Sequence, residues 1–257
     1  INVLGNFRDK RVKKSIPIFT IIDSDDDLQD IIQTSKFFTN PDIEINDFIL
    51  LGTGGSNLGA EALIEPLEKN NKINFHVIDN IETNKLLNLL EKVEARKTKI
   101  LAVSKSGNTI ETISLLLILC EWMLARGNNL KNSILVMSER KLGNKKNIIL
   151  DIAKEKNISS VRHTESIGGR FSSLTSTGLL PATVMGANPF LIRKSARTTL
   201  DYILEEIVNE FKEILIIANE QIKFMQSQNI SVTKDFKSGV GPLGGVLTAM
   251  KWIKENN

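Results

Sequence analysis

Between residues 47 and 190, short apolar runs alternate with segments of helical periodicity. The runs are rich in leucine and β-branched residues and are nearly continuous, which is typical of parallel strands covered by helices on both faces. Four runs predict strands, at Phe48–Leu51, Ile73–Ile78, Ile100–Val103 and Ser133–Met137. The patterns around them predict helices near 58–69, 83–94, 109–125 and 144–155. The alternation indicates an α/β fold, a three-layer, doubly wound parallel sheet.

The amino-terminal segment, residues 1–46, predicts a helical extension. One helix is expected to start near an acidic cluster, which we interpret as a solvated helix cap because carboxylates complement a helix amino terminus. The cluster consists of Asp23, Asp25, Asp26 and Asp27.

The carboxyl-terminal segment, residues 191–257, predicts a helical tail that could begin a second lobe. Apolar residues from Leu200 to Ile222 recur at spacings of three and four, which predicts one long or two short amphipathic helices. A strand at Ile230–Val232, a glycine-rich stretch at Ser238–Gly245 and a last helical stretch follow. We therefore expect three parts: 1–46, a ligand-binding domain at 47–190, and 191–257.

Composition narrows the function classes. Of the 257 residues 33 are basic and 30 acidic, a formal net charge of +3, and only 5% are aromatic. The basic residues are scattered, so the basic stripe with stacking platforms expected of nucleic-acid binders is absent from the sequence. The longest strongly apolar run, Leu115 to Cys120, is too short to cross a membrane. Cys120 is the single cysteine, which excludes an intramolecular disulfide and favours a reducing compartment, the cytoplasm.

The first candidate for chemistry is the segment Leu51 to Gly59, directly after the first expected strand. Glycines there let the backbone turn sharply, and free N–H groups at the start of the next helix attract an anion. Ser56 could add a hydroxyl donor beside the backbone of Gly55. The glycine spacing departs from the dinucleotide-binding fingerprint by one residue, and no Lys-Ser/Thr pair closes the segment as a P-loop.

The second candidate is the hydroxyl-rich segment Ser104 to Thr109, which follows the third expected strand and precedes a helix. Its side chains include Lys105 and Ser106. Ligands of open α/β sheets bind at the carboxyl ends of the strands, and hydroxyls with backbone N–H groups can surround the oxygens of a phosphate monoester. A helix cap formed by Thr109 is the alternative. The two segments leave strands that should lie close together, so we expect them to share one anion.

The third candidate is Gly168-Gly169-Arg170-Phe171-Ser172, followed at Gly178 by Gly-Leu-Leu-Pro. A glycine pair exposes the backbone and projects the guanidinium of Arg170, which stays charged at any relevant pH. Such a cation can stabilise an oxyanion that forms in a transition state.

In their order and separation, these segments resemble the glucose-6-phosphate isomerase family, whose lobes have the sugar-isomerase (SIS) fold. The resemblance covers about residues 40–186 and rests on three motifs. They are the G-x-G-G-S-x-L-G-like stretch ending at Gly59, the S-K-[ST]-x-x-T-x-E-T-like stretch from Ser104, and the G-G-R-[FY]-S and G-L-L-P stretches from Gly168 to Pro181.

The resemblance implies an enzyme of glycolysis and gluconeogenesis that interconverts glucose 6-phosphate and fructose 6-phosphate, with no metal and no organic cofactor. It also implies a homodimer. By position, Arg170 corresponds to the arginine that stabilises the enediolate-like transition state, with the backbone of Gly169 beside the substrate. The groups that correspond to the phosphate site are Gly55, Ser56, Ser104, Lys105, Ser106 and Thr109.

The sequence departs from the family where proton transfer is concerned. The family takes its carboxylate base from an M-E-S-x-G-K-like segment, and its ring-opening histidine and a lysine from further along the chain; none of these motifs is recognisable here. His76 and His163 fall outside the histidine motif, and we interpret them as structural or surface residues; Glu255 fits poorly as a base. We therefore expect a truncated chain that binds better than it catalyses. A stand-alone SIS-domain sugar-phosphate sensor and another aldose-ketose phosphate isomerase remain alternatives.

Overall fold

The computed structural model describes residues 17–39, 44–70, 72–140, 146–210, 214–217 and 230–233. The chain forms two compact units, one of residues 16–197 and one in which 1–15 join 198–257. All three candidate segments belong to the first unit. No helix in the described parts of the chain is both long and apolar enough to cross a membrane.

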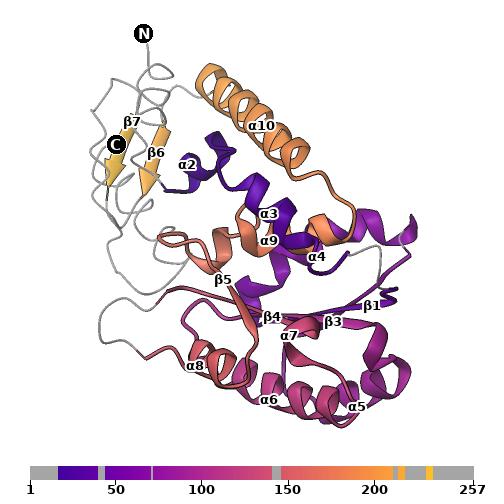
Figure 1. Ribbon diagram of the computed structural model, residues 1–257. Helices are drawn as coiled ribbons and strands as arrows, with labels where there is room; N and C mark the ends of the chain where they lie inside the picture. The colour runs from indigo at the N-terminus through magenta and orange to yellow at the C-terminus, as the bar shows by residue number, and fades with distance from the viewer. Residues whose placement is uncertain are drawn as a thin grey trace. The chain divides into compact units, whose positions relative to one another are not determined.

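A five-stranded, fully parallel sheet lies at the centre of the first unit, in the order β2-β1-β3-β4-β5 (Figure 1). Its strands are β1 (Asp47–Leu51), β2 (Asn74–Ile78), β3 (Thr98–Val103), β4 (Ile134–Ser138) and β5 (Ser159–Arg162). The four predicted strands are confirmed to within two residues. Strand β5 is not predicted, because its Ser-Ser-Val-Arg sequence lacks an apolar run and three of its four residues are exposed at the edge of the sheet.

Helices cover both faces of the sheet, as the α/β prediction requires (Figure 1). One layer contains α5 (Thr83–Lys92), α6 (Ile110–Leu124), α7 (Leu130–Ser133) and α8 (Ile148–Glu155). The opposite layer contains α3 (Leu28–Ser35), α4 (Leu58–Ile64) and α9 (Ser176–Val184), with α2 (Pro17–Asp23) before them. Short 3-10 turns are η1 (Gly54–Ser56), η2 (Glu65–Asn70), η3 (Ala95–Lys97) and η4 (Gly169–Phe171).

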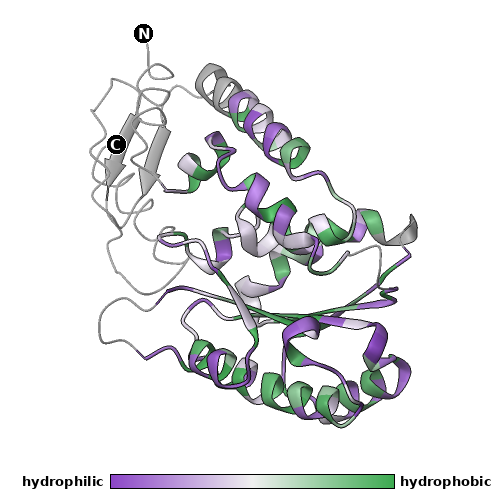
Figure 2. Cartoon of the chain, viewed as in Figure 1, coloured by the Kyte–Doolittle hydropathy of each residue, from purple (hydrophilic) through white to green (hydrophobic). Residues whose placement is uncertain are grey.

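The core has two halves, one on each side of the sheet. In β1, Ile49 and Leu51 pack against the α5, α6 and α8 layer, whereas Phe48 and Leu50 pack against the α3, α4 and α9 layer. All five residues of this strand are buried, which explains the unbroken apolar run in the sequence. Figure 2 shows apolar residues along the central strands and on the helices that cover them.

Helix α10 (Pro189–Glu210) confirms the helix predicted after Pro189. The prediction that the helical pattern continues beyond it is wrong, because Ile214–Ile217 form β6, paired in parallel with β7 (Ile230–Thr233). A run of four branched apolar residues satisfies a strand as well as a helical stripe, and strand pairing decides between them. The predicted strand at Ile230–Val232 is confirmed within β7; the glycine-rich stretch and the last helical stretch lie outside the described residues.

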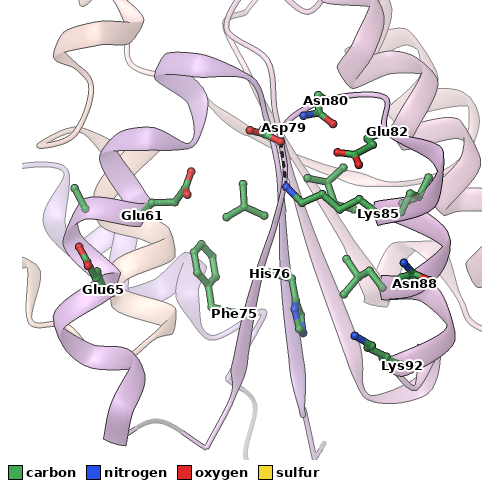
Figure 3. A pocket seen from close by; sticks show the side chains of 15 residues that line it. Glu61, Glu65, Phe75, His76, Asp79, Asn80, Glu82, Lys85, Asn88 and Lys92 are labelled. Carbon is green, nitrogen blue, oxygen red and sulfur yellow. Dashed lines mark ion pairs between the residues drawn. The ribbon is translucent and has the colours of Figure 1, made fainter.

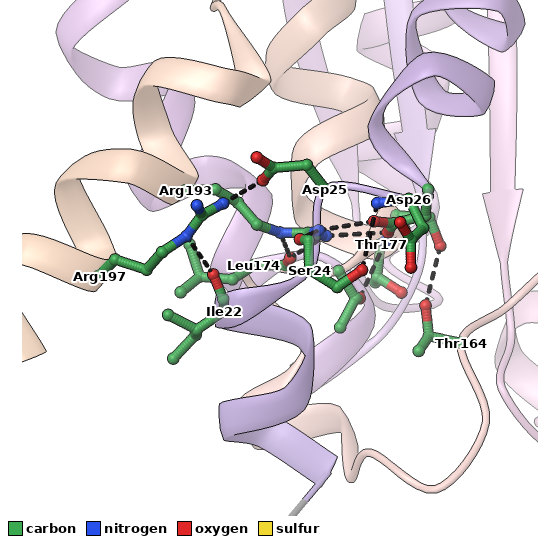
Figure 4. Close-up of polar contacts among 12 residues, drawn as sticks. Ile22, Ser24, Asp25, Asp26, Thr164, Leu174, Thr177, Arg193 and Arg197 are labelled. Atoms are coloured by element: carbon green, nitrogen blue, oxygen red, sulfur yellow. Dashed lines mark hydrogen bonds and ion pairs between the residues drawn. The ribbon is translucent and has the colours of Figure 1, made fainter. Parts of the chain in front are cut away.

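The prediction that the acidic cluster before α3 is a solvated cap is only partly right: Asp23, Asp25 and Asp26 are exposed, but two members of the cluster form ion pairs. Asp27 occupies the amino-terminal capping position of α3, but its side chain makes no capping hydrogen bond. Instead Asp27 pairs with Arg193 of α10 at 2.6 Å, and Asp25 pairs with Arg197 (Figure 4). The correction is tertiary in origin, since the arginines lie more than 160 residues further along the chain.

Candidate sugar-phosphate site

The first two candidate segments leave the same edge of the sheet from neighbouring strands. Strands β1 and β3 pair directly, with Leu51 opposite Ala102. A Cβ atom placed on Gly52 would lie 2.9 Å from the Cβ of Ser56 and 3.3 Å from the carbonyl oxygen of Val103. The two turns therefore begin side by side, as predicted.

The second turn holds its hydroxyls in a fixed arrangement. Ser104 is buried, and its Oγ donates to Oγ1 of Thr109 at 3.2 Å while accepting a hydrogen bond from the backbone N–H of Gly107 at 3.2 Å. Thr109 stands at the amino-terminal capping position of α6, yet its side chain makes no capping bond. Gly107 has a φ of +70°, and a Cβ there would lie 1.8 Å from Oδ1 of Asn147. The hydroxyls of Ser104 and Thr109 are therefore held by bonds within the turn, and the Thr109 side chain does not cap α6.

The other two predicted site residues of this turn, Ser106 and Lys105, make different contacts. Ser106 is exposed, and its Oγ accepts from the backbone N–H of Asn108 at 3.2 Å. The side chain of Lys105 is engaged within the protein: its Nζ donates to the carbonyl oxygen of Ile167 at 2.8 Å and lies 3.4 Å from the carboxylate of Glu139. Lys105 therefore ties the second turn to the residue before the Gly168–Ser172 segment.

The third segment contacts the first through its backbone. Gly169 begins η4, and a Cβ placed on Gly55 would lie only 2.3 Å from the carbonyl carbon of Gly169. Ser172, which is buried, donates from Oγ toward the carbonyl oxygens of Gly55 at 2.9 Å and Gly169 at 2.6 Å. All three turns thus meet at one edge of the sheet.

Arg170 is exposed, and it lies in the sequence between Gly169 and Ser172, both of which contact Gly55. No hydrogen bond or ion pair holds its guanidinium within the part of the chain that the structure describes. A cation on a turn that contacts the first, hydroxyl-bearing turn suits a ligand that carries a phosphate and develops a second negative charge. Ser172 completes this arrangement, although the sequence marks it only as the last member of the Gly-Gly-Arg-Phe-Ser stretch.

Neither histidine is free to act at these turns. His163 is buried; its Nδ1 lies 2.9 Å from the carbonyl oxygen of Thr164, and its Nε2 lies 3.0 Å from Oγ1 of Thr177. Burial lowers the pKa of His163, which favours a neutral ring. His76 pairs through Nε2 with Asp47 at 2.8 Å. Both histidines therefore support the fold.

A pocket of about 940 Å³ lies along the edge strand β2, between α4 and α5 (Figure 3). At one end of it Asp79 forms an ion pair with Lys85 at 3.8 Å, and Glu61 stands across the groove. None of the predicted site residues lines this pocket. Within the described residues, no three His, Cys, Asp or Glu side chains form a group that could hold a metal ion.

Comparison with known proteins adds an independent finding. A family model described as phosphoglucose isomerase matches residues 17–203, which include all three turns. A glucose-6-phosphate isomerase of Thermus thermophilus is 35% identical over 159 residues, covering 62% of this chain and 37% of that protein. The glucose-6-phosphate isomerase of Fusobacterium nucleatum is 30% identical over 202 residues, covering 74% and 44%. The chain thus spans less than half the length of these relatives.

Solved structures give the same fold. The crystal structure of a hypothetical protein from Thermus thermophilus aligns with a TM-score of 0.64 and 26% identity, covering 85% of this chain and 56% of that one. A glucose-6-phosphate isomerase from Chlamydia trachomatis aligns with a TM-score of 0.54, covering 75% of this chain and 40% of that one, and at 15% identity it supports the fold alone.

Proposed function

Because the chain belongs to the phosphoglucose isomerase family, we propose that it provides the phosphate-binding lobe of an enzyme that interconverts glucose 6-phosphate and fructose 6-phosphate. The observation that carries the proposal is the meeting of the three turns, in which the backbones of Gly55 and Gly169 touch. Parallel sheets bind ligands at the carboxyl ends of their strands, and the turns lie there. The domain at 47–190 contains all of them.

In this proposal the substrate phosphate lies between the first two turns. Ser56, Ser104, Ser106 and Thr109 supply hydroxyls, while the backbone N–H groups of Gly55 and Lys105 complete the set. The start of α6, a helix of 15 residues, favours the phosphate dianion by up to about 1 kcal/mol. Because the side chain of Lys105 is already engaged, the lysine contributes through its backbone and by bracing the neighbouring turn.

Arg170 acts in the chemical step. Moving a proton between C1 and C2 of the open-chain sugar leaves negative charge on the oxygens of an enediolate, and a guanidinium held beside them lowers the energy of that state. The backbone of Gly169 lies next to the reacting end of the sugar. The base that removes the proton does not come from the described histidines, since both are engaged in the fold.

Compartment and assembly are proposed on separate grounds. A single cysteine, buried in α6, suits the reducing cytoplasm. We propose a homodimer by likeness to the family, which light scattering of the purified chain would test.

Calorimetric titration tests the proposed function. We expect the full chain to bind fructose 6-phosphate and to bind fructose much more weakly, because the phosphate makes most of the contacts. Arg170→Ala is the matched variant for this preference, since it alters the third turn and leaves intact the protein hydroxyls that are proposed to bind the phosphate. Equal affinities for fructose and fructose 6-phosphate would refute a phosphate site at these turns.

A further inference from the structure

Arg193, in the first turns of α10, is fully buried, and each of its five N–H groups has an acceptor (Figure 4). Two donate to the carboxylate of Asp27 at 2.6 and 2.8 Å, and one to the carbonyl oxygen of Ser24 at 2.5 Å. The remaining two donate to the carbonyl oxygen of Leu174 at 2.9 and 3.2 Å. A guanidinium has five donors, so none is left over.

Leu174 lies only four residues after Arg170, in the turn that leads from η4 into α9. The residue before it, Ser173, is wedged against two helices, because a Cβ on Gly59 would lie 2.4 Å from its Oγ and a Cβ on Gly178 would lie 2.1 Å from its carbonyl oxygen. This turn can therefore shift only if a neighbour moves.

Ser172 connects the turn to the candidate site. Its Oγ donates toward the carbonyl oxygens of Gly55 and Gly169, and its own carbonyl oxygen accepts from Oγ1 of Thr175 at 2.7 Å. A continuous series of hydrogen bonds and peptide bonds thus runs from Arg193 through Leu174 and Ser172 to the glycine contact that holds Arg170 beside the first turn.

The burial of Arg193 makes this arrangement specific. A buried guanidinium is tolerated only where all its donors are matched, so any displacement of the Leu174 carbonyl leaves a charged donor unpaired at a high free-energy cost. The planar group also fixes direction, because Asp27 is held by two parallel bonds. Arg193 therefore defines one position for the turn rather than merely covering it.

We propose that Arg193 is a positioning residue for Arg170, holding the Gly168–Leu174 segment in the place where the Arg170 guanidinium faces the charged end of the substrate. The inference rests on the proposed function for the role of Arg170. Arg193 itself touches no substrate, since it is completely buried. Its loss should therefore weaken what Arg170 contributes more than what the phosphate hydroxyls contribute.

Arg197 offers a matched control. It lies one turn further along α10, donates to the carbonyl oxygen of Ile22 at 2.6 Å and pairs with Asp25. Both partners belong to the segment before α3, so Arg197 shares the helix, the residue type and the pairing of Arg193 but not the bond to Leu174.

The test compares two probes that share a C6 phosphate. 6-Phosphogluconate carries a carboxylate at C1, whereas sorbitol 6-phosphate carries a neutral alcohol there. The ratio of their dissociation constants is measured by calorimetry on the full chain and reports how much a cation near C1 contributes to binding. In the wild-type chain we expect 6-phosphogluconate to bind about tenfold more tightly than sorbitol 6-phosphate. Arg170→Ala sets the ratio without that cation.

We expect Arg193→Met to bring the ratio close to that of Arg170→Ala, while affinity for sorbitol 6-phosphate changes less than about threefold. Arg197→Met should keep the wild-type ratio. A folded Arg193→Met protein with the wild-type ratio, or an equal loss in Arg197→Met, would overturn the proposal. If Arg193→Met does not fold, Asp27→Asn replaces it, since weakening the carboxylate clamp should lower the same ratio; an unchanged ratio there counts against the proposal.

Amide hydrogen exchange separates this inference from the proposed function. The N–H groups of Phe171 and Ser172 donate to Gly168 and Gly169 within η4. They should exchange faster in Arg193→Met or Asp27→Asn than in Arg197→Met, whether or not a sugar phosphate binds. If the wild-type chain binds neither probe, the proposed function fails, and exchange alone tests whether Arg193 holds the Gly168–Leu174 segment: unchanged exchange refutes this holding role and faster exchange supports it.

Discussion

The contact between Gly55 and Gly169 makes Gly55→Ala an informative substitution. The added Cβ would lie 2.3 Å from the carbonyl carbon and 2.5 Å from the carbonyl oxygen of Gly169. Because non-bonded carbon atoms approach to about 3.5 Å, the two turns must separate by about 1 Å. Gly168→Ala is the matched control: its φ is −65°, and a Cβ there would meet only the ring of Phe171, at 3.7 Å.

The expected loss of stability in Gly55→Ala depends on which atoms of Gly169 meet the added Cβ. Backbone atoms of Gly169 cannot rotate away as a side chain could, so overpacking at Gly55 should cost about 1–3 kcal/mol of the free energy of unfolding. For a unit of this size that lowers the unfolding temperature by about 3–10 °C. Gly168→Ala should be neutral or stabilising by up to about 1 kcal/mol, since it only restricts the unfolded chain.

Binding should respond more strongly than stability. A shift of about 1 Å in a positioned group can cost about a hundredfold, so Gly55→Ala should reduce affinity for 6-phosphogluconate by more than about tenfold. Thermal unfolding and calorimetric titration of both variants provide the measurement. If Gly55→Ala behaves as wild type, or if Gly168→Ala loses as much, the glycine contact does not organise the site.

Other parts of the structure lead to four more expected outcomes. Ser104→Ala and Thr109→Ala should each weaken binding of fructose 6-phosphate by about 1–3 kcal/mol in calorimetry, whereas unchanged affinity in both would reduce these hydroxyls to turn-forming groups. Burial raises the pKa of the Cys120 thiol to about 11, so the native chain should resist a thiol reagent at about pH 8 and react fully in denaturant; rapid native labelling would contradict its burial. Burial lowers the pKa of His163, so this ring binds a proton more readily in the unfolded chain than in the folded one. The free energy of unfolding should therefore be unaffected by this ring above about pH 6.5, and it should fall as the pH drops from there through the pKa of the folded state. Urea titrations at several pH values should show that His163→Gln loses this part of the pH dependence. The chain alone should show negligible isomerisation of fructose 6-phosphate in a coupled assay, because a missing base costs about 10²–10⁴ in rate; turnover abolished by Arg170→Ala would refute this.

The layers of the fold follow from local patterns, and the departures have identifiable causes. Buried strands such as β1 and β3 are apolar in most of their residues because both of their faces are covered, and their sequences show it. Strand β5 lies at an exposed edge and needs no apolar run, so nothing in its sequence separates it from a loop. The apolar run in β6 suits both a helix and a strand, and only its pairing with β7 decides between them.

The residues that we predict to bind an anion were identified from the amino-acid order alone. Glycines and hydroxyls directly after apolar runs are suited to anion binding, because ligands of parallel sheets bind where the strands end. The residues of each turn are close together in the sequence, so their spacing can be seen without the structure. The family likeness added the order of the three segments and the role expected for Arg170.

How those turns are held together depends on tertiary packing. The approach of Gly55 to Gly169, the bond from Lys105 to Ile167 and the burial of Arg193 all join residues more than 15 positions apart in the chain. Such contacts produce no periodic pattern in the sequence, because the packing of the helices on the sheet determines which residues meet. For the same reason the carboxylates before α3 read as a solvated cap until the packing of α10 supplies their arginines.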